Sequence, residues 1–206
     1  MKPRSPQGRA AHRLDARQPP AMKPRPTQTQ LEAATRRKVR DLIRPGLDVL
    51  FCGINPGRYS AAAGHHFAGP GNLFWPTLHA AGFTSRRFTP FEDAQLLPLG
   101  FGITNFVARA SASAAELSPD ELRAGVEPLT RKVRRHAPRF VAFLGLGAYR
   151  IAFDRRQAQV GLQPETLGPA RIWLLPNPSG LNAHHQVPVL KQMFADLLRV
   201  VRAPAR

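Results

Sequence analysis

The sequence predicts an α/β domain with an open, mainly parallel sheet that helices cover on both faces. Four continuous apolar runs bounded by turn residues are typical of strands buried in such a sheet, and they lie at residues 48–54, 101–107, 140–146 and 172–177. Segments with apolar residues at helical spacing lie around these runs. Sheets built in this way bind ligands at the carboxyl ends of their strands.

The N-terminal part of the domain is predicted as a helix followed by a strand. Apolar residues recur at helical spacing over residues 29–43, until a Pro-Gly pair at 45–46 ends the element. The buried strand at 48–54 follows at once. Residues 72–81 then predict a helix that has Pro76 in its first turn or at a kink.

The C-terminal half continues the alternation of helices and strands. The predicted helix at 120–135 has the clearest start, because Ser118 precedes Pro119 at the first helical position and acidic residues follow in the first turn. This helix leads into the strand at 140–146. The remaining predicted helices span residues 147–153 and 187–201.

Residues 1–26 are predicted to be a disordered basic tail. They contain seven Lys or Arg, one Asp, six Pro and almost no large apolar side chain, so folding would not repay the lost chain entropy. The whole chain carries +17, and subtracting the tail's +6 leaves +11 on the domain at residues 27–206. Such an excess favours a polyanionic partner, with nucleic acid as the first candidate. The tail either holds the protein near nucleic acid or has no role.

Composition excludes several other classes of protein. Cys52 is the only cysteine, so the chain cannot form an intramolecular disulfide, a four-cysteine zinc site or a four-cysteine iron–sulfur cluster. No apolar run reaches the roughly 18 residues of a membrane span, and the N-terminus lacks the apolar stretch of a secretory signal. We therefore expect a cytoplasmic, monomeric protein without metal, cofactor or membrane partner.

Two loops that directly follow predicted strands have compositions that packing alone does not require. They are GINPG at residues 53–57 and NPSGL at residues 177–181. Each holds an asparagine on a rigid turn beside small residues, where a ligand can approach the backbone closely. Either loop alone could be an ordinary turn, but their shared position at strand ends favours the rim of a pocket.

The chain resembles one known family over about residues 47–200. The resemblance begins at VLFCGINPGRYSAAAGHHFAGPGNLFWPTLHAAGFTSR (49–86) and continues through GFGITNFVARAS (100–111), FLGLGAYR (143–150) and IWLLPNPSGLNAHH (172–185). These segments are similar to the mismatch-specific uracil-DNA glycosylases, which include the thymine-DNA glycosylases. The resemblance implies a three-layer α/β/α sandwich with a mainly parallel central sheet. It also implies a monofunctional DNA repair glycosylase that hydrolyses the N-glycosidic bond of a flipped-out uracil in mismatched double-stranded DNA, leaving an abasic site.

The resemblance also implies roles for residues of the two loops and of the segment between them. Asn55 would position the attacking water, and Asn177 would help to hold that water from the opposite loop. An amide is a weak base, but it can orient a nucleophile toward a sugar that becomes cationic as its bond breaks. Phe67 would stack on the extruded base, with a core phenylalanine as the alternative.

Three further residues are expected to contact the base edge or to shape the pocket. Ser60 and the backbone of Ile54 would make the polar contacts to the base. Gly57 stands where stricter uracil enzymes carry a bulky aromatic residue that excludes a C5 substituent. This pocket is therefore expected to admit larger pyrimidines as well as uracil.

A carboxylate would assist the reaction more strongly than an amide, and Asp93 is the best candidate. It lies beside Glu92 in TPFEDAQ, between the first loop and the strand at 101–107, where pocket loops should converge. There it could stabilise the cationic sugar or polarise water. The alternative is an acid in the first turn of a short helix after Thr89 and Pro90.

The stretch that begins at Gly180 corresponds to the wedge that fills the gap left by a flipped nucleotide. Leu181 is the expected plug, flanked by Gly180 and Asn182. Related enzymes often carry an arginine two residues after this leucine to read the opposite guanine, whereas this chain has Ala183. Discrimination against paired uracil, or uracil in single-stranded DNA, is therefore expected to be weaker.

Other classes of function have less support. GLGAYR lacks the third glycine of a dinucleotide fingerprint, and GINPGRYS lacks the lysine and serine of a phosphate-binding P-loop. The adjacent His65 and His66 do not share a face for binding a metal, and they receive no role. The serious alternative is a basic DNA-binding protein that kept the fold and lost the reaction.

Overall fold

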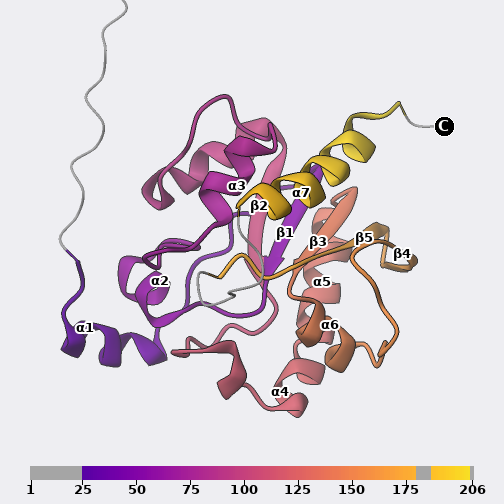
Figure 1. Ribbon diagram of the computed structural model, residues 1–206. Helices are drawn as coiled ribbons and strands as arrows, with labels where there is room; N and C mark the ends of the chain where they lie inside the picture. The colour runs from indigo at the N-terminus through magenta and orange to yellow at the C-terminus, as the bar shows by residue number, and fades with distance from the viewer. Residues whose placement is uncertain (1–24, 180–186, 205–206) are drawn as a thin grey trace, which may run out of the picture.

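The computed structural model describes residues 25–179 and 187–204 and shows a five-stranded sheet with helices on both faces (Figure 1). The strands lie in the order β2 (Phe101–Asn105), β1 (Val49–Gly53), β3 (Phe140–Leu144), β5 (Ala170–Leu175) and β4 (Gly161–Leu167). The first four run parallel, and β4 pairs antiparallel with β5. The predicted α/β class with a mainly parallel sheet is confirmed. Most of the predicted tail at residues 1–26 lies outside the described residues.

The helices occupy both faces of this sheet. They are α1 (Gln28–Ala33), η1 (Ala34–Arg36), α2 (Arg58–Ala63), α3 (Phe74–Ala80), η2 (Pro90–Leu99), η3 (Ala114–Glu116), α4 (Pro119–Ala124), α5 (Val126–His136), α6 (Leu146–Ala152) and α7 (Val187–Arg202). None of the helices in the described ranges is long and apolar enough to cross a membrane.

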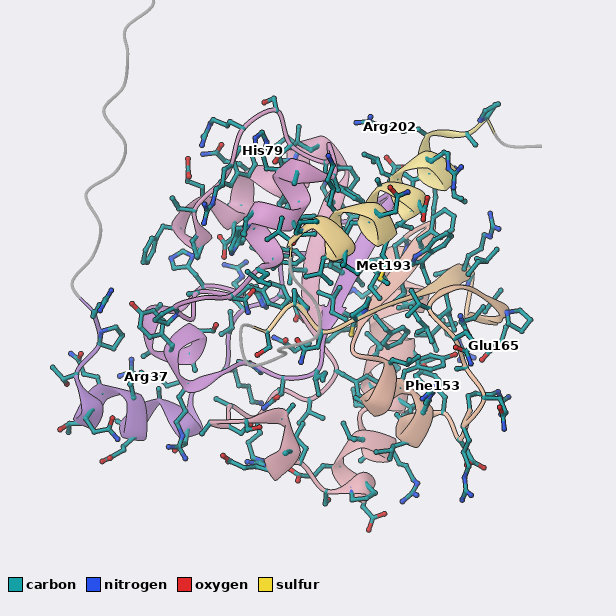
Figure 2. All side chains as sticks on the ribbon, viewed as in Figure 1. Arg37, His79, Phe153, Glu165, Met193 and Arg202 are labelled. Atoms are coloured by element: carbon teal, nitrogen blue, oxygen red, sulfur yellow. The ribbon has the colours of Figure 1, made fainter. Side chains whose placement is uncertain are left out.

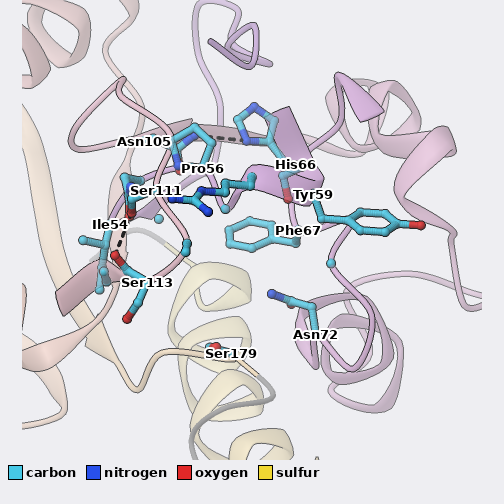
Figure 3. Close-up of a pocket in the computed structure, with 18 of the residues that line it drawn as sticks. Ile54, Pro56, Tyr59, His66, Phe67, Asn72, Asn105, Ser111, Ser113 and Ser179 are labelled. Atoms are coloured by element: carbon cyan, nitrogen blue, oxygen red, sulfur yellow. Dashed lines mark hydrogen bonds between the residues drawn. The ribbon is translucent and has the colours of Figure 1, made fainter. Parts of the chain in front are cut away.

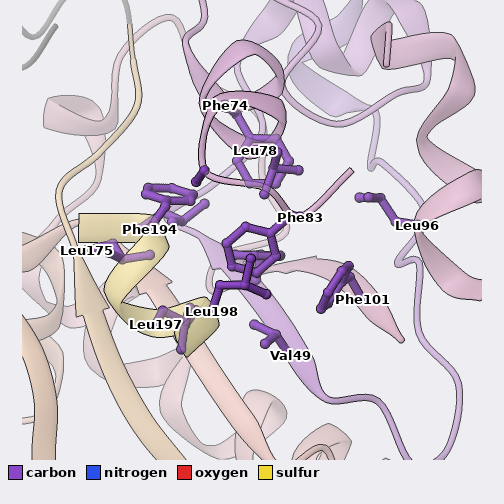
Figure 4. Packing of buried hydrophobic residues seen from close by; sticks show 14 of the residues in the cluster. Val49, Phe74, Leu78, Phe83, Leu96, Phe101, Leu175, Phe194, Leu197 and Leu198 are labelled. Carbon is purple, nitrogen blue, oxygen red and sulfur yellow. The ribbon is translucent and has the colours of Figure 1, made fainter. Parts of the chain in front are cut away.

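Side chains of the central strands alternate between two cores because successive residues of a strand face opposite sides of the sheet. Phe51 of β1 packs with Phe74 of α3 and Phe194 of α7 in one core. Figure 4 shows Phe74 and Phe194 within this cluster. Cys52, the neighbour of Phe51, lies in the other core, which α4, α5 and α6 cover. Burial raises the pKa of the Cys52 thiol and keeps it protonated. The two cores make the three layers that were expected.

The helix predicted over residues 29–43 is shorter in the structure. It ends at residue 36 after α1 and η1, and the chain then runs extended. Leu42 pairs with Ile103 of β2 through two backbone hydrogen bonds of 2.8 Å. The backbone of an edge strand needs hydrogen-bond partners, and this segment supplies them. Leu42 therefore packs beside β2, whereas Val39 packs against Ala34 and Ala61.

The other predicted helices are present with shifted ends. Pro76 is the third residue of α3 and lies in its first turn, and Ser118 caps α4 with Pro119 at the first position. The helix predicted at 120–135 is divided at Gly125, where an added Cβ would lie 2.8 Å from the Phe106 carbonyl oxygen. The loop that follows β2 approaches so closely here that residue 125 has no room for a side chain.

Strand β4 was not predicted. Only alternate residues of it are buried, it contains Pro164, and its pairing with β5 shifts between Leu162 and Thr166. These are properties of an edge strand. Tyr149 of α6 holds β4 in place by donating a 2.7 Å hydrogen bond to Glu165, and it stacks on Phe153; Figure 2 shows Phe153 and Glu165 at the same corner of the molecule.

Candidate active site at the carboxyl edge of the sheet

The loops after β1, β2 and β5 border one cleft with a cavity volume of about 790 Å³ (Figure 3). The residues predicted for the site that line this cleft are Ile54, Asn55, Gly57, Ser60, Phe67 and Asn177. The two asparagine loops, which are more than a hundred residues apart in the chain, therefore face the same space. Gly180, Leu181 and Asn182 of the predicted wedge lie outside the described residues.

Asn55 is held through both hydrogens of its amide group. Nδ2 donates to the Arg109 carbonyl oxygen at 2.8 Å and to Ser111 Oγ at 2.7 Å. Ser111 Oγ in turn donates to the Ser113 carbonyl oxygen at 2.7 Å. An amide has only two hydrogens to donate, so both are used. The Oδ1 atom, to which no described residue donates, is the acceptor that Asn55 offers to a molecule in the cleft.

The loop that carries Asn55 is paired along its length with the chain that follows β2. Val107 N donates to the Ile54 carbonyl oxygen at 2.8 Å, and Ser111 N donates to that of Pro56 at 3.1 Å. Arg58 N returns a bond of 3.1 Å to the Ser111 carbonyl oxygen. This pairing fixes the loop. It also engages the carbonyl oxygen of Ile54, the residue whose backbone was expected to contact the base.

The segment that holds Asn55 is anchored to α4. Arg109 donates from Nε to Glu121 Oε1 at 2.8 Å and from Nη2 to the Glu116 carbonyl oxygen at 3.2 Å. The hydrogen bond from Arg109 lowers the pKa of Glu121 to about 2, so the ion pair is complete at neutral pH. A surface ion pair thus positions the backbone carbonyl that Asn55 uses.

Phe67 lies against Phe74, with ring centroids 4.1 Å apart and an interplanar angle of 29°. Its backbone has a φ of 54°, in the left-handed region that few residues other than glycine adopt. Such a conformation persists only where the surroundings enforce it. One face of the ring is covered by Phe74, and the side chain also lines the cleft, as a stacking platform for a planar ligand requires.

Asn105 and His66 form a polar pair on the cleft wall that sequence reasoning missed. Asn105 ends β2, and its Nδ2 lies 3.4 Å from His66 Nδ1 (Figure 3). His66 Nε2 lies 3.0 Å from the Arg40 carbonyl oxygen, which can only accept, so Nε2 carries the hydrogen and Nδ1 accepts from Asn105. Burial lowers the pKa of His66 and favours this neutral form.

The tautomer of His66 fixes the orientation of the Asn105 amide. One Nδ2 hydrogen is used, which leaves one hydrogen and Oδ1 for a ligand. The signal that found Asn55 and Asn177, an asparagine at the end of a buried parallel strand, also applies to Asn105. It was overlooked because no proline or glycine marks a turn there.

Ser60 and Gly57 occupy different parts of the cleft. Ser60 is buried, and its Oγ accepts a 3.0 Å hydrogen bond from Ala68 N, which leaves the hydroxyl hydrogen to donate. An added Cβ at Gly57 would meet nothing within 4 Å. The fold therefore has room for a side chain at position 57, and this space is open because the sequence has glycine there.

The loop after β5 is tied to the start of α3. Leu73 N donates to the Pro178 carbonyl oxygen at 2.8 Å, and Asn177 Oδ1 accepts from Ser179 N at 3.1 Å. The latter bond makes the local turn that asparagine favours. Asn177 also lines the cleft.

The structure does not bring Asp93 into the cleft. The Asp93 side chain is buried and is not among the described residues that line the cleft, and its Oδ2 lies 3.0 Å from His65 Nδ1. Asp93 belongs to the first turn of η2, and Glu92 completes the capping box with Thr89, which is the alternative considered for these acids. The hydrogen bond from Arg86 lowers the pKa of Glu92 to about 2. Position between two loops in the sequence did not predict where the side chain points.

Comparison with known proteins agrees with this architecture. The family model of the uracil DNA glycosylase superfamily matches residues 40–201. A solution NMR structure of a candidate uracil DNA glycosylase from Methanosarcina acetivorans superposes with a TM-score of 0.53 at 15% identity, covering 79% of this chain and 98% of the other. This likeness supports the fold, and the family match extends over most of the chain. The chain therefore belongs to the uracil DNA glycosylase superfamily.

Proposed function

We propose that this DNA glycosylase hydrolyses the N-glycosidic bond of uracil and related pyrimidines that have been flipped out of mismatched DNA. The observation that carries the proposal is the amide of Asn55, which is held through both of its hydrogens and keeps Oδ1 for the cleft. The product would be an abasic site in the strand.

Asn55 acts on water by orienting it. Oδ1 accepts one hydrogen of the water and so directs an oxygen lone pair toward C1′ of the deoxyribose. The bond to the base breaks early, the sugar becomes cationic, and the base leaves as an anion. No Asp or Glu is among the described residues that line the cleft, which supports a reaction assisted by an amide. Because an amide does not remove the proton from water, we expect a slow enzyme.

The base is selected by stacking and by its hydrogen-bonding edge. Phe67 supplies the ring face, worth about 1–3 kcal/mol per stacked base. Asn105 presents one N–H and one oxygen, which match the 4-oxo group and the N3–H of uracil, whereas cytosine presents an amino group and an unprotonated nitrogen. His66 prevents the amide from turning over to suit cytosine. Ser60 can donate a further hydrogen bond.

Substrate range follows from the small residues of the site. Gly57 leaves open the space where a bulky side chain would exclude a C5 substituent. We propose that 5-substituted uracils are substrates. We also propose that Leu181 fills the gap in the duplex and that Ala183 contributes little reading of the opposite base; both lie outside the described residues. Discrimination of uracil opposite guanine from uracil opposite adenine and from uracil in a single strand should then be weaker than in relatives that carry the arginine.

The decisive experiment measures free uracil and alkali-labile sites in a labelled oligonucleotide. Asn55→Ala is expected to lower the single-turnover rate about a hundredfold or more. Asp93→Asn, the matched substitution outside the cleft, should stay close to wild type in rate and lose thermal stability. If wild-type protein binds the oligonucleotide but releases no uracil, the proposal fails and a DNA-binding protein without activity is favoured. Strict dependence on opposite guanine would contradict the proposed role of Ala183.

A further inference from the structure

Arg58 is a charged residue of the cleft that the reaction described above does not use. It is the first residue of α2 and lies three residues after Asn55 in the loop that follows β1. Its Nε atom is buried and has no hydrogen-bond partner, and the side chain forms no ion pair with any described residue. An exposed arginine such as Arg156 can give its hydrogens to water, but a buried Nε cannot.

No acidic side chain on the described part of the cleft wall neutralises Arg58. Among the described residues that line the cleft, no Asp or Glu is present, and Arg58 is the only Lys or Arg. His66, also on the wall, is kept neutral by burial. A buried donor without a partner destabilises the protein unless a ligand supplies an acceptor. Because Arg58 lines the cleft, a molecule that enters the cleft is the candidate to supply that acceptor.

The chemistry of the reaction restricts which part of the substrate this can be. Cleavage makes the sugar cationic, so a guanidinium group near C1′ would oppose it. Phosphodiesters flank that sugar on both sides and are anionic throughout. The planar donor array of arginine matches phosphate oxygens and forms paired hydrogen bonds with them. Because Asn55 and Arg58 share one rigid loop, a phosphate bound by Arg58 would fix the sugar relative to the water held by Asn55.

We propose that Arg58 binds a backbone phosphate adjacent to the extruded nucleotide and thereby positions its sugar over Asn55. This inference rests on the proposed function, since it takes a flipped nucleotide as the ligand. The guanidinium group of Arg58 would bind the sugar-phosphate backbone of the substrate, whereas Asn105 and Phe67 would bind the base.

The test measures binding to a duplex that carries uncleavable 2′-fluoroarabino-uridine opposite guanine. Three duplexes are compared: one unmodified, and two with a single neutral methylphosphonate at the 5′ or the 3′ phosphate of that nucleotide. Wild type should lose about tenfold or more in affinity from one of the two replacements. Arg58→Gln should lose a similar factor on unmodified DNA and should then be insensitive to that replacement. Arg58→Lys, which keeps the charge without the planar array, should fall between them.

Arg156→Gln is the matched control, because it removes one exposed positive charge outside the cleft. It should respond to the methylphosphonates as wild type does, and thermal unfolding should show that Arg58→Gln is folded. The proposal is overturned if, for both methylphosphonates, the loss of affinity of Arg58→Gln on the modified duplex equals the product of the loss from the substitution and the loss from the methylphosphonate. It is also overturned if Arg58→Gln leaves the affinity for DNA unchanged but slows the release of uracil far more than the release of 5-fluorouracil. Because 5-fluorouracil is the better leaving group, this result would show that Arg58 stabilises the anion of the departing base and does not bind a phosphate.

Failure of the proposed function gives a different result. Wild type would then release no uracil from cleavable DNA. The comparison of methylphosphonates would still report whether Arg58 contacts a phosphate, because it depends on binding alone.

Discussion

Gly53 has no room for a side chain at the end of β1. A Cβ there would lie 2.7 Å from Asn105 Oδ1 and 3.3 Å from the ring of Phe67. Gly53→Ala should therefore displace the two groups proposed to hold the base. A shift of about 1 Å in a binding group can cost on the order of a hundredfold in rate, so we expect a large fall in the single-turnover rate of uracil release.

Gly57→Ala provides the control for this substitution, because a Cβ at position 57 meets nothing within 4 Å and its φ of −69° suits alanine. It should leave the rate on uracil near wild type. Equal rates for the two alanine variants would show that the packing of Gly53 against Asn105 has no part in catalysis.

His66 makes stability depend on pH. Burial lowers its pKa from the usual 6.5, opposed by the Arg40 carbonyl and by the charges of Asp93 and Asp41. The unfolded chain takes up a proton near pH 6.5, whereas the folded protein resists it down to the lowered pKa. Stability is therefore full above pH 6.5 and falls as the pH drops toward that lowered value. Protonation would also turn Nδ1 into a donor and break the contact with Asn105.

Thermal unfolding between pH 7.5 and pH 5 tests this dependence. The melting temperature of wild type should fall more steeply below pH 6.5 than that of His66→Gln, which keeps an amide donor and acceptor but does not titrate. Parallel curves for the two proteins would show that His66 is not the group responsible.

Among the elements, α4 controls the site from outside the cleft. Its residue Glu121 holds Arg109, whose carbonyl oxygen and near neighbour Ser111 hold Asn55. Arg109→Gln should loosen this segment and lower the single-turnover rate by about threefold to tenfold. Because exposed ion pairs contribute little to stability, the melting temperature should change little.

Arg131→Gln is the matched control for α4, since it removes an exposed arginine that pairs with Glu127 at 3.0 Å on α5. Its rate should equal that of wild type. If Arg109→Gln also has the wild-type rate, the anchor on α4 is dispensable for placing Asn55.

The strands of the sheet were predictable because parallel strands buried on both faces are apolar at nearly every position, and β1 and β3 are. Strand β2 is equally buried but also contains Thr104 and Asn105. Strand β4 was missed because an edge strand escapes this requirement. The predicted helix at 29–43 was wrong beyond residue 36, since apolar spacing alone does not exclude an extended segment that pairs with β2.

The site was predictable where topology determines it. Asn55 and Asn177 follow parallel strands, so the sheet itself brings them to one edge. Asp93 lies in the first turn of η2 and not at the carboxyl end of a strand, and its side chain pairs with His65 outside the lining of the cleft. The Asn105 and His66 pair depends on a carbonyl group of residue 40, a contact that only the three-dimensional structure reveals.

At the scale of the whole molecule, positive charge is divided between the domain and the tail. Residues 1–26 carry +6 of the total +17, and the described helix α1 begins just after them, with Thr27 as its N-cap. α1 also reaches the cleft, since Gln28 and Leu31 line it. The tail therefore joins the domain at a helix that borders the cleft, and its charges would add phosphate contacts to bound DNA.

Removal of residues 1–26 should separate DNA capture from chemistry. Each lost phosphate contact lowers the slope of log affinity against log salt concentration by about 0.9, so the shortened protein should bind undamaged duplex more weakly and with less salt dependence. Its single-turnover rate at saturating protein should not change, because the cleft groups from Gly53 to Asn177 remain. The measurement is a salt titration of binding to undamaged duplex for both proteins. An unchanged slope would assign DNA capture to the +11 of the domain alone.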